Sequence, residues 1–319
     1  MNPERFHTLL ETLNRHIIGQ PALTERMLIT LLADGHLLVE GPPGLAKTKA
    51  VRTLANLIEG DFHRIQFTPD LLPSDVTGTE VWRHEAGVFE FQPGPIFHNL
   101  ILADEINRAP AKVQSALLEA MAEGQVTVGN RTLPMPRLFM VMATQNPIEQ
   151  EGTYPLPEAQ LDRFLIKVDI DYPRDAEAEQ RILQLVEAEA RHEDEALPEP
   201  LSQDALFEAR RAVLDLHMAD SVRTYIVQLI LATRQPDAWD KDLARWIQYG
   251  ASPRATLALA RTARVHAWLA GKDFVSPDDV RALAADVLRH RLLLTFDAEA
   301  EGITPDQVIE RLLTVVPVA

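Results

Sequence analysis

With 319 residues, the chain is long enough for about two domains of ordinary size. Its hydrophobic fraction of 46% and charged fraction of 24% are those of a globular protein, which excludes a collagen-like or mainly disordered chain. The formal net charge of −16 argues against a protein that grips nucleic acid through a broad basic surface.

Strand and helix patterns alternate through the first part of the chain. Two helical stretches come before residue 33, and short apolar runs then predict buried strands at residues 37–39, 62–67, 100–103, 138–143 and 164–170. Because helical patterns separate these runs, we expect an α/β domain with a parallel sheet over residues 1–172. Residues 77–92 and 125–136 break the rhythm with short alternating stretches around glycine, which predict two β-hairpin insertions.

The strand signals stop at residue 173. Helical periodicity follows at residues 176–190, 203–216, 223–233, 253–269, 277–292 and 305–313, and several of these segments open with Ser or Thr before Pro. We therefore expect an all-α second domain over residues 173–319.

The composition and the N-terminus also bear on location. The chain has no cysteine, so it forms no disulfides and no thiolate zinc site, as suits a reducing compartment. Its first residues lead into charged, helix-like sequence, and no run of 18 apolar residues occurs. We expect a cytoplasmic protein with no integral membrane segment.

The most informative motif lies between a predicted strand and a predicted helix, which is the setting of a phosphate-binding loop. In such a loop the backbone N–H groups hold phosphate oxygens, the lysine reaches the β and γ phosphates, and the following hydroxyl ligates Mg²⁺. Alanine stands where the motif has its last glycine, so the backbone there must stay in a region open to L-residues. A plain turn with an exposed lysine is the alternative. The loop consists of Gly41, Pro42, Pro43, Gly44, Leu45, Ala46, Lys47 and Thr48.

Two acids follow the apolar run at residues 100–103. Asp104 and Glu105 should lie at the carboxyl edge of the sheet, where ligands bind in open α/β folds. Acids in such a place are often only solvated, but with Lys47 and Thr48 upstream we expect Asp104 to hold Mg²⁺ and Glu105 to deprotonate the attacking water. Asn146, after the next strand, could bind the γ-phosphate and that water, or simply form a turn.

Two arginines complete the set of candidates. Arg163 stands just before the last predicted strand, and it could equally pair with a nearby acid. Arg254 lies in the first turn of a predicted helix, where a cation opposes the helix dipole, so it should have an anionic partner.

Taken together, these segments resemble the MoxR family of AAA+ ATPases over nearly the whole chain. The resemblance is carried by residues 41–48, 66–75, 103–109, 143–147, 161–164 and 250–254. It implies a P-loop AAA+ domain with β-hairpin insertions and a helical lid, and ATP and Mg²⁺ as cofactors. It assigns Lys47 and Thr48 to Walker A, Asp104 and Glu105 to Walker B, Asn146 to sensor 1, Arg163 to the arginine finger, Arg254 to sensor 2, and Ile17, Ile18 and Gly19 to the adenine contact.

The same resemblance implies a homo-oligomer, typically a hexamer, that uses ATP to mature or activate client proteins, often ones with a von Willebrand factor A-type domain. Three alternatives stay open: a small-molecule kinase, a DNA-remodelling motor, and the motor subunit of a metal-chelatase-like complex. A kinase would not need both arginines and a lid. A DNA motor fits poorly with the net charge and with a hairpin at residues 125–136 whose tip offers only Arg131.

Overall fold

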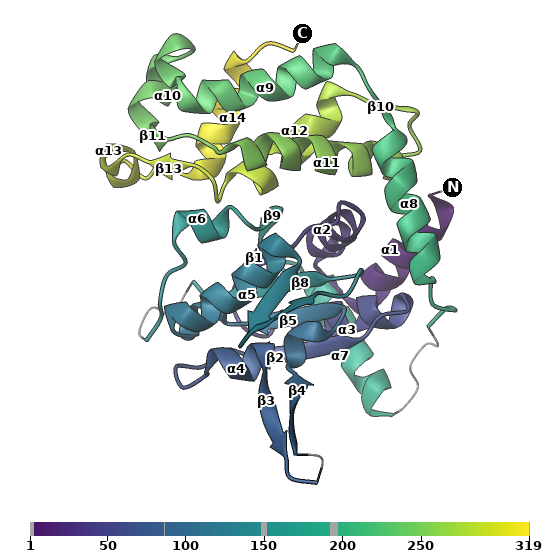
Figure 1. Cartoon of the computed structure of the whole chain (residues 1–319). Helices are drawn as coiled ribbons and strands as arrows, with labels where there is room; N and C mark the ends of the chain where they lie inside the picture. The colour runs from purple at the N-terminus through teal and green to yellow at the C-terminus, as the bar shows by residue number, and fades with distance from the viewer. Residues whose placement is uncertain (1–2, 86, 148–151, 192–196, 319) are drawn as a thin grey trace. The chain divides into compact units, whose positions relative to one another are not determined.

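A computed structural model of the chain describes residues 3–85, 87–147, 152–191 and 197–318 (Figure 1). These residues form two compact units, each assembled from separate stretches of chain. The α/β unit consists of the described residues of Thr8–Leu156 and Val168–Leu206. The helical unit consists of those of Met1–His7, Pro157–Lys167 and Phe207–Ala319.

A five-stranded sheet in the order β2-β5-β8-β1-β9 is the centre of the α/β unit. The pairs β2–β5, β5–β8 and β1–β8 are parallel, as the alternating sequence pattern predicts. Strands β5 and β8 are buried almost throughout, which is why they read as unbroken apolar runs in the sequence. The strands are β1 (Leu37–Glu40), β2 (Phe62–Gln66), β5 (Leu100–Asp104), β8 (Met140–Gln145) and β9 (Ile166–Asp169).

Helices surround this sheet (Figure 1). The register pairs Gln66 with Asp104 and Glu40 with Gln145, so the carboxyl ends of four strands meet along one edge. The helices of the α/β unit are α2 (Pro21–Leu32), α3 (Lys47–Leu57), α4 (Pro73–Thr77), α5 (Ala111–Glu123) and α7 (Ala176–Ala190), with 3₁₀ turns η1 (Pro95–Phe97) and η2 (Ile106–Arg108). Two more helices, α1 (Glu4–His16) and α8 (Gln203–Asp215), have residues in both units.

Both predicted insertions are antiparallel hairpins. Strands β3 (Gly78–Arg83) and β4 (Val88–Pro93) form the first, which projects from the α/β unit, and β6 (Gln125–Val128) and β7 (Arg131–Pro134) form the second (Figure 1). The first hairpin carries an exposed edge-to-face pair, Trp82 and Phe89, with ring centroids 5.0 Å apart.

The helical unit packs its helices around an apolar core in which Phe6 meets the edge of Trp268 at 5.3 Å. It also holds two small sheets that the sequence pattern does not reveal, because strands of two or three residues are too short to show alternation. The sheets pair β10 (His217–Met218) with β12 (Phe274–Val275) and β11 (Ile247–Tyr249) with β13 (Leu293–Leu294). The helices are α6 (Glu158–Leu161), α9 (Asp220–Arg234), η3 (Pro236–Ala238), α10 (Lys241–Trp246), α11 (Pro253–Leu269), α12 (Pro277–Leu288), α13 (Phe296–Ala300) and α14 (Pro305–Val315).

By its contacts, α7 groups with the α/β unit, whereas α6 groups with the helical unit. The domain boundary near residue 172 stays a prediction. Within the described ranges, no helix is both long enough and apolar enough to cross a bilayer.

Candidate active site

The loop between β1 and α3 has the backbone of a phosphate cradle. Gly41 passes so close to Ile170 that an added Cβ would lie 2.5 Å from both its Cγ1 and its carbonyl oxygen, so no larger residue fits. Helix α3 begins at Lys47, which places Lys47 and Thr48 in its first turn, beside N–H groups that have no partner within the helix. The Lys47 Nζ donates a hydrogen bond to the carbonyl oxygen of Gly41 at 2.7 Å, so the side chain lies back over the loop.

Ala46 has a backbone conformation that glycine adopts more readily than alanine. Its backbone lies in the left-handed region, with φ 53° and ψ 22°. This region is small for L-residues, and occupying it costs roughly 1–2 kcal/mol. The loop therefore holds a strained alanine directly before the lysine.

Asp104 and Glu105 lie together at the edge of the sheet, and Thr144 at the end of β8 fixes both of them. Glu105 also has a left-handed backbone, with φ 57°. Its N–H donates to the Thr144 hydroxyl at 2.9 Å, and that hydroxyl donates to Asp104 Oδ1 at 2.6 Å. Since Thr144 is only 1% exposed, this bridge is shielded from water.

Polar residues on the neighbouring strand and turn reach the same two acids. Arg64 donates to Asp104 Oδ2 from Nε at 3.1 Å and from Nη2 at 2.6 Å. Gln66 donates to Glu105 Oε2 at 3.0 Å, and Arg108 forms an ion pair with the same oxygen at 2.9 Å.

Sequence reasoning missed Thr144, Arg64, Gln66 and Arg108. The available signal was on β2, where Arg64 and Gln66 alternate with the buried Ile65, as polar residues do on one face of a strand.

A cavity of about 510 Å³ opens between the loop and the acids, a volume within the range of ligand sites. Burial lowers the pKa of Lys47, and the nearby carboxylates of Asp104, Glu105 and Glu40 offset part of that effect. The lining residues are Pro43, Gly44, Leu45, Ala46, Lys47, Thr48, Lys49, Arg64, Asp104, Glu105, Thr144, Gln145 and Asn146. The structure thus brings the predicted Walker A, Walker B and sensor 1 residues to one cavity.

A second cavity, of about 440 Å³, adjoins the first along Gly44, Leu45, Ala46 and Lys49. Its far wall is formed by Ile18, Tyr172, Pro173 and apolar residues of α7, and an ion pair joins Lys49 to Glu189 of that helix. Of the three predicted adenine-contacting residues, Ile18 lines this cavity, whereas Ile17 is buried in the core and Gly19 packs against Pro173.

The donor set fits the cofactors that the sequence implies. Thr48 and Asp104 offer a hydroxyl and a carboxylate at the same cavity, and hard oxygen donors of this kind suit Mg²⁺ shared with phosphates. Loop N–H groups and the Lys47 ammonium suit a polyphosphate anion.

Arg163 and Arg254 both belong to the helical unit. Arg163 follows α6 and is half-buried, and its backbone N–H donates to the Gln160 carbonyl at 3.1 Å. Arg254 is exposed in the first turn of α11, where its backbone N–H donates to the Ser252 hydroxyl at 3.1 Å. The anionic partner of the Arg254 side chain stays a prediction.

Comparison with known proteins agrees with this geometry. Residues 36–166 match the ATPase family associated with various cellular activities (AAA), and residues 242–312 match the AAA lid domain. The chain is 47% identical to Chaperone MoxR1 of Mycobacterium tuberculosis, over 97% of this chain and 82% of that protein. It is 32% identical to Protein MoxR of Methylorubrum extorquens, over 92% and 89% of the two chains.

A solved crystal structure of a Cytophaga hutchinsonii protein superposes on the chain with a TM-score of 0.92. The two are 44% identical, and the match covers 99% of this chain and 96% of that one.

Proposed function

Because this chain belongs to the MoxR family of AAA+ ATPases, we propose that it hydrolyses ATP at the loop of residues 41–48 and uses the energy to remodel, mature or activate partner proteins. One observation carries the proposal: Lys47, Asp104, Glu105 and Asn146 border a single cavity, and a second, mainly apolar cavity shares part of its lining. A triphosphate fits the chemistry of the first cavity, and a base and ribose fit that of the second.

In this proposal each residue has a distinct task. Lys47 and the loop N–H groups hold the β and γ phosphates, while Thr48 and Asp104 provide the oxygens for Mg²⁺. Mg²⁺, when bound, neutralises charge on the phosphates. Glu105 takes a proton from the attacking water as the water oxygen bonds to the γ-phosphorus. The bond from that phosphorus to the bridging oxygen breaks, giving ADP and phosphate.

The surrounding contacts bear on how Glu105 works. Its Oε2 accepts a hydrogen bond from Gln66 and forms an ion pair with Arg108, which hold the carboxylate in place, and its backbone is fixed by Thr144. Asn146 supplies an amide to hold the γ-phosphate and the water. The base therefore works from a fixed position, which limits the reorganisation needed for proton transfer.

We also propose that the chain works as a ring, a hexamer in keeping with its family, in which Arg163 of one subunit contacts the γ-phosphate held by the next, and that Arg254 is the sensor 2 arginine. Arginine fingers of this kind contribute roughly 10³–10⁵ in rate. The clients we propose are proteins, including ones with a von Willebrand factor A-type domain. The location we propose is the cytoplasm, which a chain without cysteine suits.

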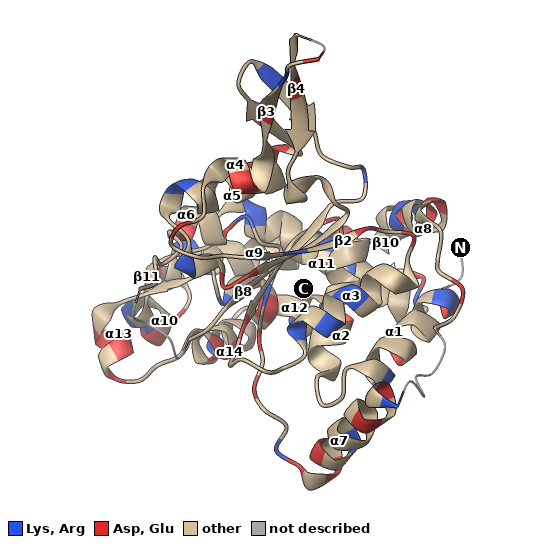
Figure 2. Ribbon diagram, turned by 90° about the horizontal axis from the view of Figure 1, so that it is seen from below, with Lys and Arg blue, Asp and Glu red and all other residues tan. Residues whose placement is uncertain are grey.

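Charge favours a protein client over nucleic acid. The β6–β7 hairpin carries one basic residue, Arg131, and the β3–β4 hairpin carries both signs of charge (Figure 2). A DNA motor would place a run of cations on such a hairpin. Stimulation of ATP hydrolysis by single-stranded DNA would favour the DNA-motor alternative, whereas an unchanged rate favours the protein client.

ATP binding by titration calorimetry tests the site directly. Lys47→Ala should abolish binding without unfolding the chain, because Lys47 is only half-buried and its ammonium contacts the loop. Lys112→Ala, which removes an exposed lysine from the first turn of α5, is the matched control and should bind as the wild type does. Near-normal ATP affinity in Lys47→Ala would show that the phosphate loop is assigned wrongly.

A further inference from the structure

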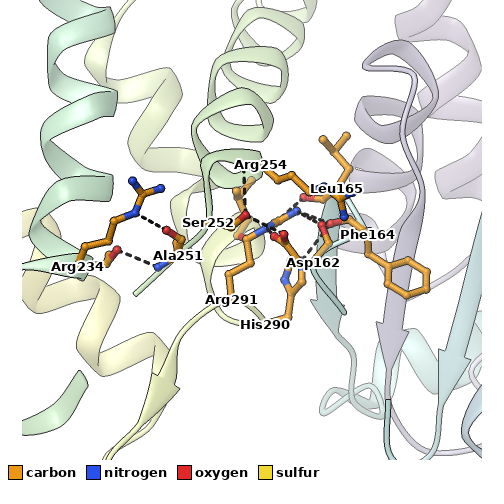
Figure 3. A network of polar contacts seen from close by, with 11 residues as sticks. Asp162, Phe164, Leu165, Arg234, Ala251, Ser252, Arg254, His290 and Arg291 are labelled. Atoms are coloured by element: carbon orange, nitrogen blue, oxygen red, sulfur yellow. Dashed lines mark hydrogen bonds and ion pairs between the residues drawn. The ribbon is translucent and has the colours of Figure 1, made fainter. Parts of the chain in front are cut away.

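Arg291 is a buried charged group of the helical unit, outside the proposed machinery, with an unusually full set of hydrogen bonds. Its side chain is only 3% exposed. All five of its hydrogen bonds go to oxygen atoms: Nε donates to Asp162 Oδ1 at 2.8 Å, Nη1 to the carbonyls of Leu165 and Val287, and Nη2 to the carbonyls of Asp162 and Phe164 (Figure 3). A guanidinium has five N–H donors, so this set uses its full capacity.

Three of the four carbonyls that Arg291 binds bracket Arg163. Asp162 precedes that residue and Phe164 and Leu165 follow it, so one buried guanidinium holds the peptide on both sides. His290 adds to the clamp, because its Nε2 donates to the Phe164 carbonyl at 3.1 Å. The backbone from which the Arg163 side chain departs is therefore fixed from within the unit.

The same clamp extends to the helix that carries Arg254. While Asp162 Oδ1 accepts from Arg291, its Oδ2 accepts a hydrogen bond from the Ser252 hydroxyl at 2.7 Å (Figure 3). That hydroxyl also caps α11 by accepting the backbone N–H of Arg254 at 3.1 Å. Two consecutive hydrogen bonds thus connect the Asp162 carboxylate to the backbone of Arg254.

The position of Ser252 is itself constrained. The preceding Gly250 runs so close to Thr233 that an added Cβ would lie 2.3 Å from the Thr233 carbonyl oxygen. Ala251 then donates its N–H to the Thr233 hydroxyl at 3.0 Å and accepts from Arg234 Nε at 2.7 Å (Figure 3). The Ser252 hydroxyl therefore meets Asp162 from a backbone that is fixed on its own side.

We propose that Arg291, acting through Asp162 and Ser252, is a positioning residue that holds Arg163 and the Arg254 helix end as one rigid body. A displacement of this end of α11 then moves Arg163 as well, so the placement of both arginines depends on one buried guanidinium. The inference rests on the proposed roles of Arg163 and Arg254, neither of which Arg291 needs to touch.

The test compares Arg291→Lys with Arg289→Lys. Lysine keeps the charge but has three donors on one atom, so it cannot bind these carbonyls and Asp162 together. Arg289 is the matched control: its side chain is 11% exposed, and it binds Asp286, Asp306 and the Lys167 carbonyl rather than the residues around Arg163. Both variants should lose thermal stability. Only Arg291→Lys should lose kcat, by about 10–100-fold, at a temperature where both are folded.

Mixing experiments give a readout that a merely structural role would not move. The reference is Arg163→Ala mixed with Lys47→Ala, which should recover hydrolysis by joining an intact loop to an intact finger. Arg291→Lys mixed with Lys47→Ala should recover hydrolysis as this reference does, because an intact loop again meets an intact finger. Arg291→Lys mixed with Arg163→Ala should recover nothing, since neither subunit presents a well-placed finger.

The outcomes separate the two proposals. If Arg163→Ala hydrolysed ATP at the wild-type rate, or if the reference mixture recovered no hydrolysis, Arg163 would not be an arginine finger. The proposed ring with shared sites would then be wrong. The positioning role alone would be overturned if the reference mixture recovered hydrolysis but Arg291→Lys kept the wild-type kcat. Equal recovery when Arg291→Lys is mixed with Lys47→Ala and with Arg163→Ala would overturn it as well.

Discussion

Replacing Thr144 by valine removes one hydroxyl that two groups of the site share. Valine has nearly the shape of threonine, so the change leaves the packing of β8 intact and deletes only the polar contact. The Glu105 N–H, held on a left-handed backbone, loses its acceptor, and Asp104 loses a donor at 2.6 Å.

The free energy lost at each of the two groups can be estimated separately. A buried N–H without a partner costs about 1–3 kcal/mol, and a hydrogen bond to a charged group contributes about 1.5–3 kcal/mol. Asp104 keeps both bonds from Arg64, so we take the lower end of the second range and expect a total of about 2.5–4.5 kcal/mol. For a unit of this size, each kcal/mol shifts Tm by about 2–4 °C, which gives a fall of about 10 °C.

Scanning calorimetry measures this fall, with Thr144→Ser as the control. Serine keeps the hydroxyl and loses one methyl group, so it should cost only about 1 kcal/mol. We also expect kcat to drop at least tenfold in Thr144→Val, because Glu105 is no longer held, and to change little in Thr144→Ser. Equal Tm values for the two variants would refute the view that the hydroxyl, rather than packing, organises the acids.

Four further outcomes follow from the described contacts. Ala46→Gly should stabilise the chain by about 0.5–1 kcal/mol in urea unfolding, because glycine relieves the left-handed strain at some cost in unfolded-state entropy, and a loss of stability would contradict the strain. Glu105→Gln should bind ATP but release phosphate about 10²–10⁴-fold more slowly, and turnover comparable to wild type would exclude Glu105 as the base. Asp104→Asn should raise the Mg²⁺ concentration needed for hydrolysis. Deleting residues 125–136 should leave basal hydrolysis largely intact and end its response to a client; loss of ATP binding would mean that the hairpin is structural. Burial lowers the pKa of His290 well below its ordinary value. Below about pH 6.5 the unfolded chain therefore binds a proton that folded His290 does not bind, and the free energy of unfolding should fall as the pH drops. His290→Gln should reduce this pH dependence, measured by urea unfolding at a series of pH values.

The sequence predicts the main elements well where local physics determines them. Buried strands such as β5 are unbroken apolar runs, and helices such as α11 open with Ser252 and a following proline, so both can be recognised without a structure. The acids at 104–105 and the loop at 41–48 are found for the same reason, because each directly follows a strand.

Contacts across the fold cannot be predicted in this way. Arg64 and Thr144 reach Asp104 only because β5 lies between β2 and β8, an order that no local pattern encodes. Asp162 and Arg291 are 129 residues apart, and nothing in the sequence of either segment points to the other.

The rate of phosphate release, measured against protein concentration, tests the central claim most directly. Hydrolysis at a site completed by the Arg163 of another subunit should give a specific activity that rises with concentration and then levels off, with Lys47→Ala at background throughout. If wild type released phosphate no faster than Lys47→Ala at any concentration, the claim that this site hydrolyses ATP would be contradicted. A concentration-independent rate from a monomeric sample would contradict a site shared between subunits.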